Sequence, residues 1–181
     1  MKMRVAIITA GVLGFGAQAF AVNILVNPGF ETHTVAGWTT SSFAATNNEW
    51  HSGAWSAGAS GNVSMTQTFT AAPTSSVTEV SFWAKHPGFS SFEFEFDLLY
   101  SDASVTQLFV SGGTGNTWSQ FNFTSNLDAS KSLSGIRIFG RTTGSFAAYD
   151  DFVVNVNPVP EPASFAVLGL GAVALLRRRR K

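Results

Sequence analysis

The chain has 181 residues, equal numbers of acidic and basic side chains, and no cysteine. This length suits one ordinary domain plus short processing segments and excludes a large multidomain enzyme. Without cysteine there can be no disulfide framework, thiol nucleophile or thiolate metal site. Residues 22–157 hold four basic and ten acidic residues, a net charge of −6. Such a domain lacks the basic surface that binds phosphates, so we expect no nucleic-acid partner.

The N-terminus has the three parts of a secretory signal peptide. Lys2 and Arg4 precede an apolar run over 5–15, and Ala19 and Ala21 supply small residues at −3 and −1. We predict cleavage after Ala21, with cleavage after Ala19 as the alternative. An uncleaved anchor is less favoured, because the apolar run is shorter than the roughly 20 residues of a membrane span.

The middle of the chain shows strand periodicity. Aromatic residues at 92, 94 and 96 alternate with acidic residues at 93, 95 and 97, so that strand has one aromatic and one acidic face. Further strands are predicted over 80–85, 105–110, 118–124, 134–140 and 147–156. Several short strands without helices predict an all-β fold, a two-sheet antiparallel β-sandwich or jelly roll.

The acidic face has two interpretations. Glu93, Glu95 and Asp97 form either the floor of a polar cleft or, as is commoner, the solvated face of the sheet. A glycosidase needs two carboxylates across a bond, one with a raised pKa, and nothing in the sequence raises a pKa here. The three histidines have no triad or zinc-ligand spacing. We therefore predict that the protein is not an enzyme.

Three short motifs stand near the ends of this domain. They are Asn-Pro-Gly-Phe-Glu at 27–31 with Gly-Trp at 37–38, His-Ser-Gly at 51–53, and Tyr-Asp-Asp-Phe at 149–152. Together they resemble the motifs of galactose-binding-like jelly-roll domains, a group that includes many carbohydrate-binding modules. The resemblance covers the two ends of the domain and one internal turn, and it implies a jelly roll.

This resemblance also implies a structural Ca²⁺ where the first and last strands meet. Its ligands would be Glu31 and Asp150, with backbone carbonyls near His51 completing a shell of oxygen atoms. Asp150 shares parity with the apolar residues of its strand, so it should point inward, where a carboxylate needs a partner or an ion. The alternative is that both carboxylates bond local backbone or pair with Arg137 or Arg141.

Aromatic side chains are candidates for stacking on a sugar ring. Trp38 and Trp118 stand where the resembling domains carry packing tryptophans, so we assign both to the core. Trp50 and Trp55 lie in a stretch rich in Gly and Ser, and Trp83 faces away from the expected core side of its strand. These three are the predicted ligand-binding aromatics.

The C-terminus has three elements in order: a Pro-Glu-Pro motif, an apolar segment over 163–176, and a basic cluster. The motif residues are Val159, Pro160, Glu161 and Pro162, and the basic cluster is Arg177, Arg178, Arg179, Arg180 and Lys181. As a short transmembrane helix the apolar segment would cover only about 21 Å, a marginal span. The basic cluster should stay cytoplasmic and leave the domain outside.

These elements resemble the PEP-CTERM sorting tail of Gram-negative bacteria that secrete exopolysaccharide. The resemblance implies processing near the Pro-Glu-Pro motif by an exosortase, a membrane-embedded cysteine protease-transferase. A simple tail anchor is the alternative.

We therefore expect a signal peptide over 1–21, a jelly-roll domain over 22–157 and a sorting tail over 158–181. The expected partners are the Sec export machinery, an exosortase and, transiently through the C-terminal helix, the inner membrane. The expected function is that of an exported surface or extracellular-matrix protein that binds exopolysaccharide or another glycan without catalysis. The alternative is a structural or adhesive biofilm-matrix component with no defined sugar ligand.

Overall fold

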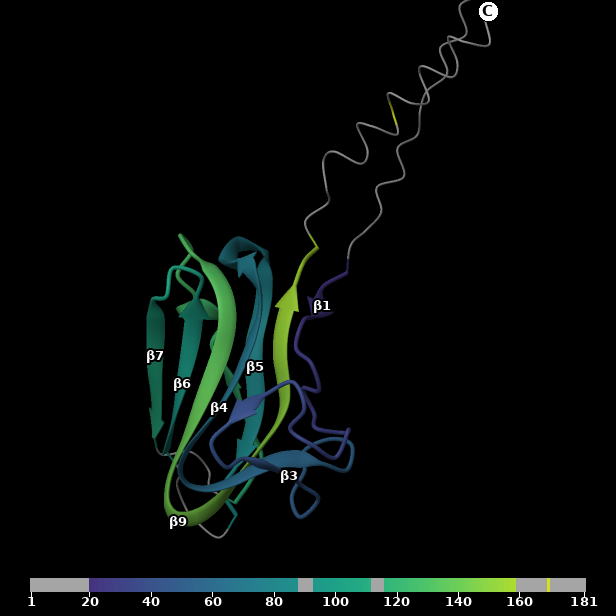
Figure 1. Ribbon diagram of the computed structural model, residues 1–181, viewed down its shortest axis with the longest axis vertical. Helices are drawn as coiled ribbons and strands as arrows, with labels where there is room; N and C mark the ends of the chain where they lie inside the picture. The colour runs from purple at the N-terminus through teal and green to yellow at the C-terminus, as the bar shows by residue number, and fades with distance from the viewer. Residues whose placement is uncertain (1–19, 88–92, 112–115, 159–168, 170–181) are drawn as a thin grey trace, which may run out of the picture.

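The computed structural model describes residues 20–87, 93–111, 116–158 and 169 (Figure 1). The predicted signal peptide, but for its last two residues, lies outside these ranges, as do the sorting motif and the basic cluster. The predicted C-terminal helix lies outside them too, apart from Gly169. Within the described ranges, no helix is both long and apolar enough to span a membrane.

The described residues form nine strands and two short 3₁₀ helices. In chain order these are β1 (Val22–Asn23), β2 (Thr39–Thr40), β3 (Ala44–Thr46), β4 (Ser56–Pro73), η1 (Thr74–Ser76), β5 (Val77–Lys85), β6 (Glu93–Tyr100), β7 (Val105–Ser111), β8 (Ser119–Asn122), η2 (Thr124–Asn126) and β9 (Ser132–Val156). Every strand pair is antiparallel. The prediction of an all-β antiparallel fold is confirmed.

The strands form one curled sheet instead of two separate sheets. β4 and β9 pair along most of their length, from Ala57 opposite Tyr149 to Pro73 opposite Ser132. The N-terminal part of β9 also pairs with β6, and its C-terminal part pairs with β5. Figure 1 shows β9 as a green arm and a yellow arm joined by a bend. Two long bent strands therefore take part in both layers and join them.

The bend coincides with an irregularity in the β4–β9 pairing. Ser60 lies opposite Phe146, but the next residue, Gly61, lies opposite Thr142. Gly61 has φ of +86°, a left-handed conformation that costs glycine little and other residues more. Bulges of this kind bend and twist a strand, which lets the pair turn from one layer into the other.

Aromatic side chains fill the space between the layers. The Phe82 ring of β5 lies with its centroid 5.1 Å from that of Phe96 on β6 and 5.0 Å from that of Phe152 on β9. All three side chains are buried, as is Phe94. The predicted inward face of the 92–97 strand is thus confirmed for both of its described phenylalanines. Each buried Phe contributes about 2–3 kcal/mol of hydrophobic stabilisation.

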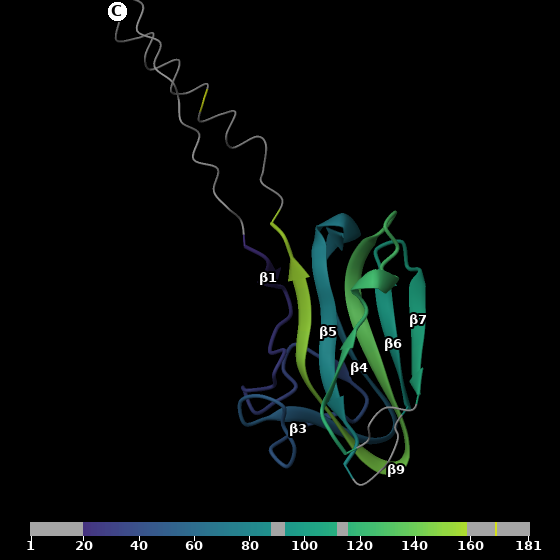
Figure 2. The ribbon, with the colours of Figure 1, turned by 180° about the vertical axis from the view of Figure 1, so that it is seen from behind.

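The two ends of the domain lie side by side. Val22 of β1 pairs with Val156 of β9 (Figure 2). The Asn23 side chain reinforces this pairing, because its Nδ2 donates to the carbonyl of Phe152 (2.9 Å) and its Oδ1 accepts from the N–H of Val154 (3.1 Å). This places the loop after β1 beside the 150–152 segment.

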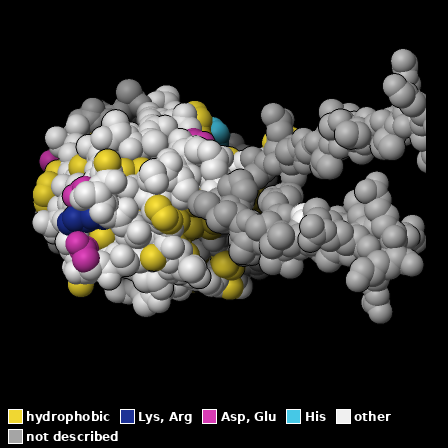
Figure 3. Space-filling view, turned by 90° about the horizontal axis from the view of Figure 1, so that it is seen from above, with side chains coloured by type: hydrophobic (Ala, Val, Ile, Leu, Met, Phe, Trp, Pro, Cys, Tyr) yellow, Lys and Arg dark blue, Asp and Glu magenta, His cyan; other side chains and the backbone are white. Residues whose placement is uncertain are grey.

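Charged residues make up only 12% of the sequence. Figure 3 shows a face on which most side chains are uncharged, with a small group of acidic and basic side chains at one edge and scattered apolar ones between. On this face, charged side chains are few.

Candidate functional site

Asp150 lies on β9 opposite Trp83 of β5, two residues before Phe152, whose N–H donates to the carbonyl of Pro28 in the loop after β1. It is fully buried, which confirms its predicted inward orientation. Its Oδ2 accepts hydrogen bonds from the backbone N–H groups of His51 (2.9 Å) and Ser52 (3.2 Å), and its Oδ1 accepts one from the N–H of Asp151 (2.8 Å). Asp151 holds the same turn through the His51 ring and the Ser52 hydroxyl, each at 2.7 Å. The His-Ser-Gly turn is therefore fastened to the last strand by two carboxylates.

Burial raises the pKa of Asp150 to about 6. The N–H of His51 opposes this increase by donating to the carboxylate, and the neighbouring charge of Asp151 adds to it. The negative charge of Asp150 is thus less well stabilised in the folded protein than in water.

Glu31 holds the other end of the turn. Its Oε1 accepts hydrogen bonds from the N–H groups of Ala54 and Trp55, both at 3.0 Å. Between the two ends, Gly53 has φ of +65°, and a Cβ added there would lie 2.2 Å from Glu31 Oε1. Glycine is therefore required at position 53 both for its backbone conformation and for the close approach of the carboxylate.

The residues of this junction fit calcium in donor type. Carboxylate and backbone oxygens are the ligands that Ca²⁺ prefers, and the raised pKa of Asp150 reports a buried charge that a cation would stabilise. Within the described ranges, however, no group of three or more His, Asp or Glu side chains could hold a metal ion. Backbone carbonyls would have to complete the shell. The backbone hydrogen bonds of Glu31 and Asp150 match the alternative interpretation, so calcium stays a prediction.

The three predicted ligand-binding tryptophans lie at the surface. Trp50 is 45% exposed. Trp55 and Trp83 are half-buried, and each stacks on a histidine: Trp55 on His33 with ring centroids 4.4 Å apart, and Trp83 on His51 at 3.8 Å. Histidine therefore covers one face of each of these two rings, and their role in binding stays a prediction.

The two tryptophans assigned to the core differ in burial. Trp38 is buried and packs on Phe30 and Phe152, which confirms its assignment. Trp118 is only half-buried, so its core assignment is wrong. It precedes β8, which pairs with β5 at the end of the strand order, and its ring meets the His51 ring edge-on at 5.7 Å. It packs on the turn at the surface and not between the layers.

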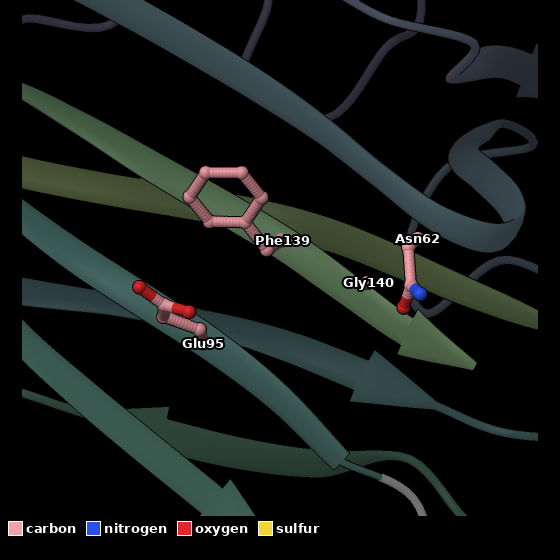
Figure 4. Close-up of a pocket in the computed structure, with 4 residues that line it drawn as sticks. All are labelled: Asn62, Glu95, Phe139 and Gly140. Atoms are coloured by element: carbon pink, nitrogen blue, oxygen red, sulfur yellow. The ribbon is translucent and has the colours of Figure 1, made fainter. Parts of the chain in front are cut away.

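A pocket of about 340 Å³ opens on the outer face of the sheet (Figure 4). It is lined by Asn62 of β4, Glu95 of β6, and Phe139 and Gly140 of β9. Glu95 and Phe139 are register partners on neighbouring strands, so their side chains lie side by side. Phe139 follows the buried Ile138, and strand alternation therefore turns its ring away from the core.

Two of the three acidic residues on the outer face of β6 are buried. Glu95 is 4% exposed and Asp97 is 0% exposed. Gln107 of β7 donates to Glu95 from Nε2 (3.0 Å), and Arg137 of β9 donates to Asp97 from Nε (2.8 Å) and from a second nitrogen. The Arg137 guanidinium also lies 4.7 Å from the centre of the Phe139 ring. Glu93 is exposed, so the solvated face is observed there, whereas Glu95 lines the pocket.

Asp97 pairs with Arg137, and Arg137 in turn contacts the Phe139 ring. Burial raises the pKa of Asp97, while its hydrogen bonds from Arg137 oppose the increase. Its Oδ1 is buried without a hydrogen-bond partner among the described residues. The ion pair fixes Arg137 in place, and Arg137 in turn holds one side of the Phe139 ring.

This arrangement is suited to binding a sugar. A phenyl ring can stack on the C–H face of a pyranose, and a carboxylate and an amide can bond its hydroxyl groups. The volume lies within the range of about 300–1,000 Å³ typical of small-ligand sites. Glu95 is the only carboxylate among the described lining residues.

Sequence reasoning missed this pocket. The alternation of residues 92–97 correctly predicted that the Glu95 side chain points away from the core. Phe139 lies within the strand that was predicted over 134–140. What brings them together is the pairing of β6 with β9 across about 40 residues of sequence, and no local signal specifies that register.

Two comparisons concern the sequence of the chain. A family model of the PEP-CTERM protein-sorting motif matches residues 158–181. The comparison with curated proteins gives no match.

Solved structures share the fold of the domain at low sequence identity. TmCBM61, in a complex with β-1,4-galactotriose, is 18% identical with a TM-score of 0.54, covering 75% of this chain and 99% of that one. The CBM22-1 xylan-binding domain of Paenibacillus barcinonensis Xyn10C is 16% identical with a TM-score of 0.55, covering 80% and 100%. The enzymatically active domain of bacteriophage CBA120 tailspike protein 4 is 15% identical with a TM-score of 0.57, but only 21% of that chain is covered. The chain thus carries a PEP-CTERM protein-sorting motif behind a β-sandwich with the fold of family 22 and family 61 carbohydrate-binding modules.

Proposed function

We propose that this protein is exported, sorted by an exosortase to the cell surface or extracellular matrix, and binds exopolysaccharide or another glycan there without catalysis. The sorting motif at 158–181 supports export and processing. The fold shared with carbohydrate-binding modules supports a glycan ligand.

The observation that carries glycan binding is the pocket on the outer face of the sheet. It combines an outward-facing phenyl ring, Phe139, with a carboxylate from Glu95 and an amide from Asn62. These are the groups that a pyranose needs, one for its apolar face and two for its hydroxyls. Galactan and xylan oligosaccharides are suitable first probes because the two modules of similar fold are described with these ligands.

Two substitutions in the pocket test the proposal, and a substitution of a surface tryptophan serves for comparison. Phe139→Ala removes the stacking ring, and we expect it to weaken glycan binding by about tenfold or more, equivalent to about 1.4 kcal/mol. Glu95→Gln keeps the shape but removes the charge, and should also weaken binding. Trp50→Ala is the matched control, since Trp50 is exposed but does not line the pocket. Calorimetric titration of the full chain in detergent measures all three.

The affinities of these variants show whether the pocket or the surface tryptophans bind the glycan. Unchanged affinity in Phe139→Ala together with a loss in Trp50→Ala would move the site to the surface tryptophans. If a broad panel that includes the exopolysaccharide of the producing bacterium gave no binding by a folded protein, the structural or adhesive alternative would replace glycan recognition.

We further propose that a structural Ca²⁺ is held by Glu31 and Asp150 with backbone carbonyls near His51. The buried, weakly stabilised charge of Asp150 supports this proposal. Bound there, the ion would lock the 51–55 turn to the last strand.

A further inference from the structure

Four residues in register form a row across the layer that holds the pocket. In this layer β6 lies between β7 and β9, and β9 lies between β6 and β4 (Figure 1). Glu95 of β6 is the register partner of Phe109 on β7 and of Phe139 on β9. Phe139 is in turn the partner of Ser64 on β4. Side chains of register partners lie on the same face of a sheet, so this outer row presents a ring, a carboxylate, a second ring and a hydroxyl.

The two ends of the outer row point away from the core, as its middle does. Leu108 and Val110, on either side of Phe109, pack against the core, and Met65, next to Ser64, is fully buried. Because side chains alternate along a strand, Phe109 and Ser64 point outward. Phe109 has an interaction of its own within the chain, yet it is 65% exposed. Its ring is therefore accessible from the face on which the pocket opens.

The spacing of the two rings suits a sugar chain. Neighbouring strands lie about 4.8 Å apart, so the backbones of Phe109 and Phe139 are separated by about 10 Å. An extended chain of pyranose units advances by a similar distance over two units. Rings at this spacing can stack on the first and third units of such a chain. Glu95 lies beside Phe139 on the neighbouring strand (Figure 4), where it can accept hydrogen bonds from hydroxyls of the middle unit.

We infer that a linear polysaccharide lies along the outer row, across the strands, and that Phe109 supplies a second stacking ring outside the pocket. This inference rests on the proposed glycan-binding function and extends its site to at least three consecutive sugar units. The outer row is open at both ends. Phe109 lies on β7, whose only partner among the described strands is β6, and the exposed Ser41 lies beside Ser64, whose N–H donates to its hydroxyl (2.9 Å). The ligand class is therefore the interior of an extended chain and not its end.

An exposed phenylalanine alone says nothing about a ligand, because single apolar side chains are common on protein surfaces. Phe109 differs from other exposed apolar residues by its place in register with two residues of the pocket. Val105 lies on the same strand and the same face and is 42% exposed, but its register partner is Leu99, outside the pocket. Val105 is therefore the matched control for Phe109.

A series of oligosaccharides of increasing length tests the inference. A disaccharide that stacks on Phe139 and reaches Glu95 stops short of Phe109, whereas a trisaccharide reaches it. Calorimetric titration of the full chain in detergent should therefore show xylan or galactan oligosaccharides of three or more units binding about tenfold more tightly than the disaccharide. Phe109→Ala should remove most of this gain and leave the affinity for the disaccharide unchanged. Phe109→Trp keeps a stacking ring and should retain the gain, and Val105→Ala should match the parent chain.

Failure of this inference is distinguishable from failure of the proposed function. If the parent chain binds the disaccharide and gains nothing from added units, the inference is overturned while the pocket stands. The same holds if Phe109→Ala, with an unchanged thermal melt, keeps the full gain. Loss of disaccharide binding in Phe139→Ala, together with loss of only the length-dependent gain in Phe109→Ala, would support both. A folded parent chain that binds neither these oligosaccharides nor the broad glycan panel overturns both.

Discussion

Two carboxylates, Asp150 and Glu31, organise the 51–55 turn of this protein, and among the described side chains no lysine or arginine forms an ion pair with either. Asp150 accepts from the first N–H groups of the 51–55 turn and Glu31 from the last. Hydrogen bonds to a charged acceptor are worth about 1.5–3 kcal/mol each, more than most neutral ones. These hydrogen bonds tie the 51–55 turn, which joins β3 to β4, to β9 and to the loop that follows β1.

Gly53 and Gly61 provide a matched test of how closely this turn is packed. Both have positive φ, but a Cβ at 61 meets nothing within 4 Å, whereas one at 53 meets Glu31 at 2.2 Å. Gly61→Ala should destabilise the protein by about 1–2 kcal/mol, from backbone strain alone. Gly53→Ala should cost about 2–4 kcal/mol, because it also displaces the carboxylate and its two hydrogen bonds. Urea unfolding measures both, and equal losses would contradict the role assigned to Glu31.

The raised pKa of Asp150 gives the calcium proposal a pH dependence. The folded protein binds this proton more tightly than the unfolded chain, whose value is near 3.8, while the folded value is about 6. The contribution of Asp150 to stability therefore falls as pH rises from about 4 to about 6 and is constant above that. A bound Ca²⁺ would favour the ionised form and remove this loss.

We therefore predict that millimolar Ca²⁺ raises the melting temperature relative to chelator near neutral pH. The increase should be smaller at about pH 5, where the proton competes with the ion. Asp150→Asn should abolish the increase, while Asp128→Asn, at an exposed loop far along the chain, should keep it. A melting temperature that does not respond to Ca²⁺ at either pH would rule the ion out and leave the backbone hydrogen bonds as the whole role of Asp150.

At the scale of elements, the sequence predicts faces better than it predicts pairing. Alternation in the 92–97 segment correctly gave an inward Phe94 and Phe96 because side chains on a strand alternate whatever its partner is. The burial of Glu95 and Asp97 was not predictable in this way. It depends on Gln107 and on the arginine of β9, which reach the acids only after β6 pairs with both neighbours.

The continuity of β9 was also missed, for a physical reason. Residues 134–140 and 147–156 were predicted as separate strands, and the Thr-Thr-Gly-Ser sequence at 142–145 between them is of a kind typical of turns. In the folded chain β4 runs alongside both parts, and the shift at Gly61 absorbs the extra residues. Tertiary pairing therefore overrides local turn propensity, and one strand joins the two layers.

The motifs at 27–31, 51–53 and 149–152 were the best guide to the predicted site. They lie far apart in sequence, yet the structure brings Glu31, His51 and Asp150 to the same turn. The tryptophans were a poorer guide, because apolar rings are equally at home in a core, on a turn or in a ligand site. Residue type alone could not separate Trp118 from Trp38.

At the scale of the whole molecule, both ends of the domain leave from one side. Val22, the residue that follows the predicted signal cleavage, pairs with Val156 shortly before the sorting tail. The N–H of Asn157 still donates to the carbonyl of Ser76 (2.8 Å), so the fold extends almost to the tail. Only Pro158 and Val159 separate Asn157 from Pro160, a length of chain that spans about 10 Å at most.

This short connection means that a protease acting at the Pro-Glu-Pro motif must work close to the folded end of β9. We predict that in a host with an exosortase the mature chain begins at Val22 and lacks Arg177–Lys181. Replacing Pro160, Glu161 and Pro162 by alanine should preserve the tail, because alanine lets the apolar helix extend through the motif. Replacing Pro158 alone by alanine should leave processing intact, so that the tail is still removed. Intact-mass analysis distinguishes these products, and a mature parent protein that still ends at Lys181 would show that the tail is an anchor and not a processing signal.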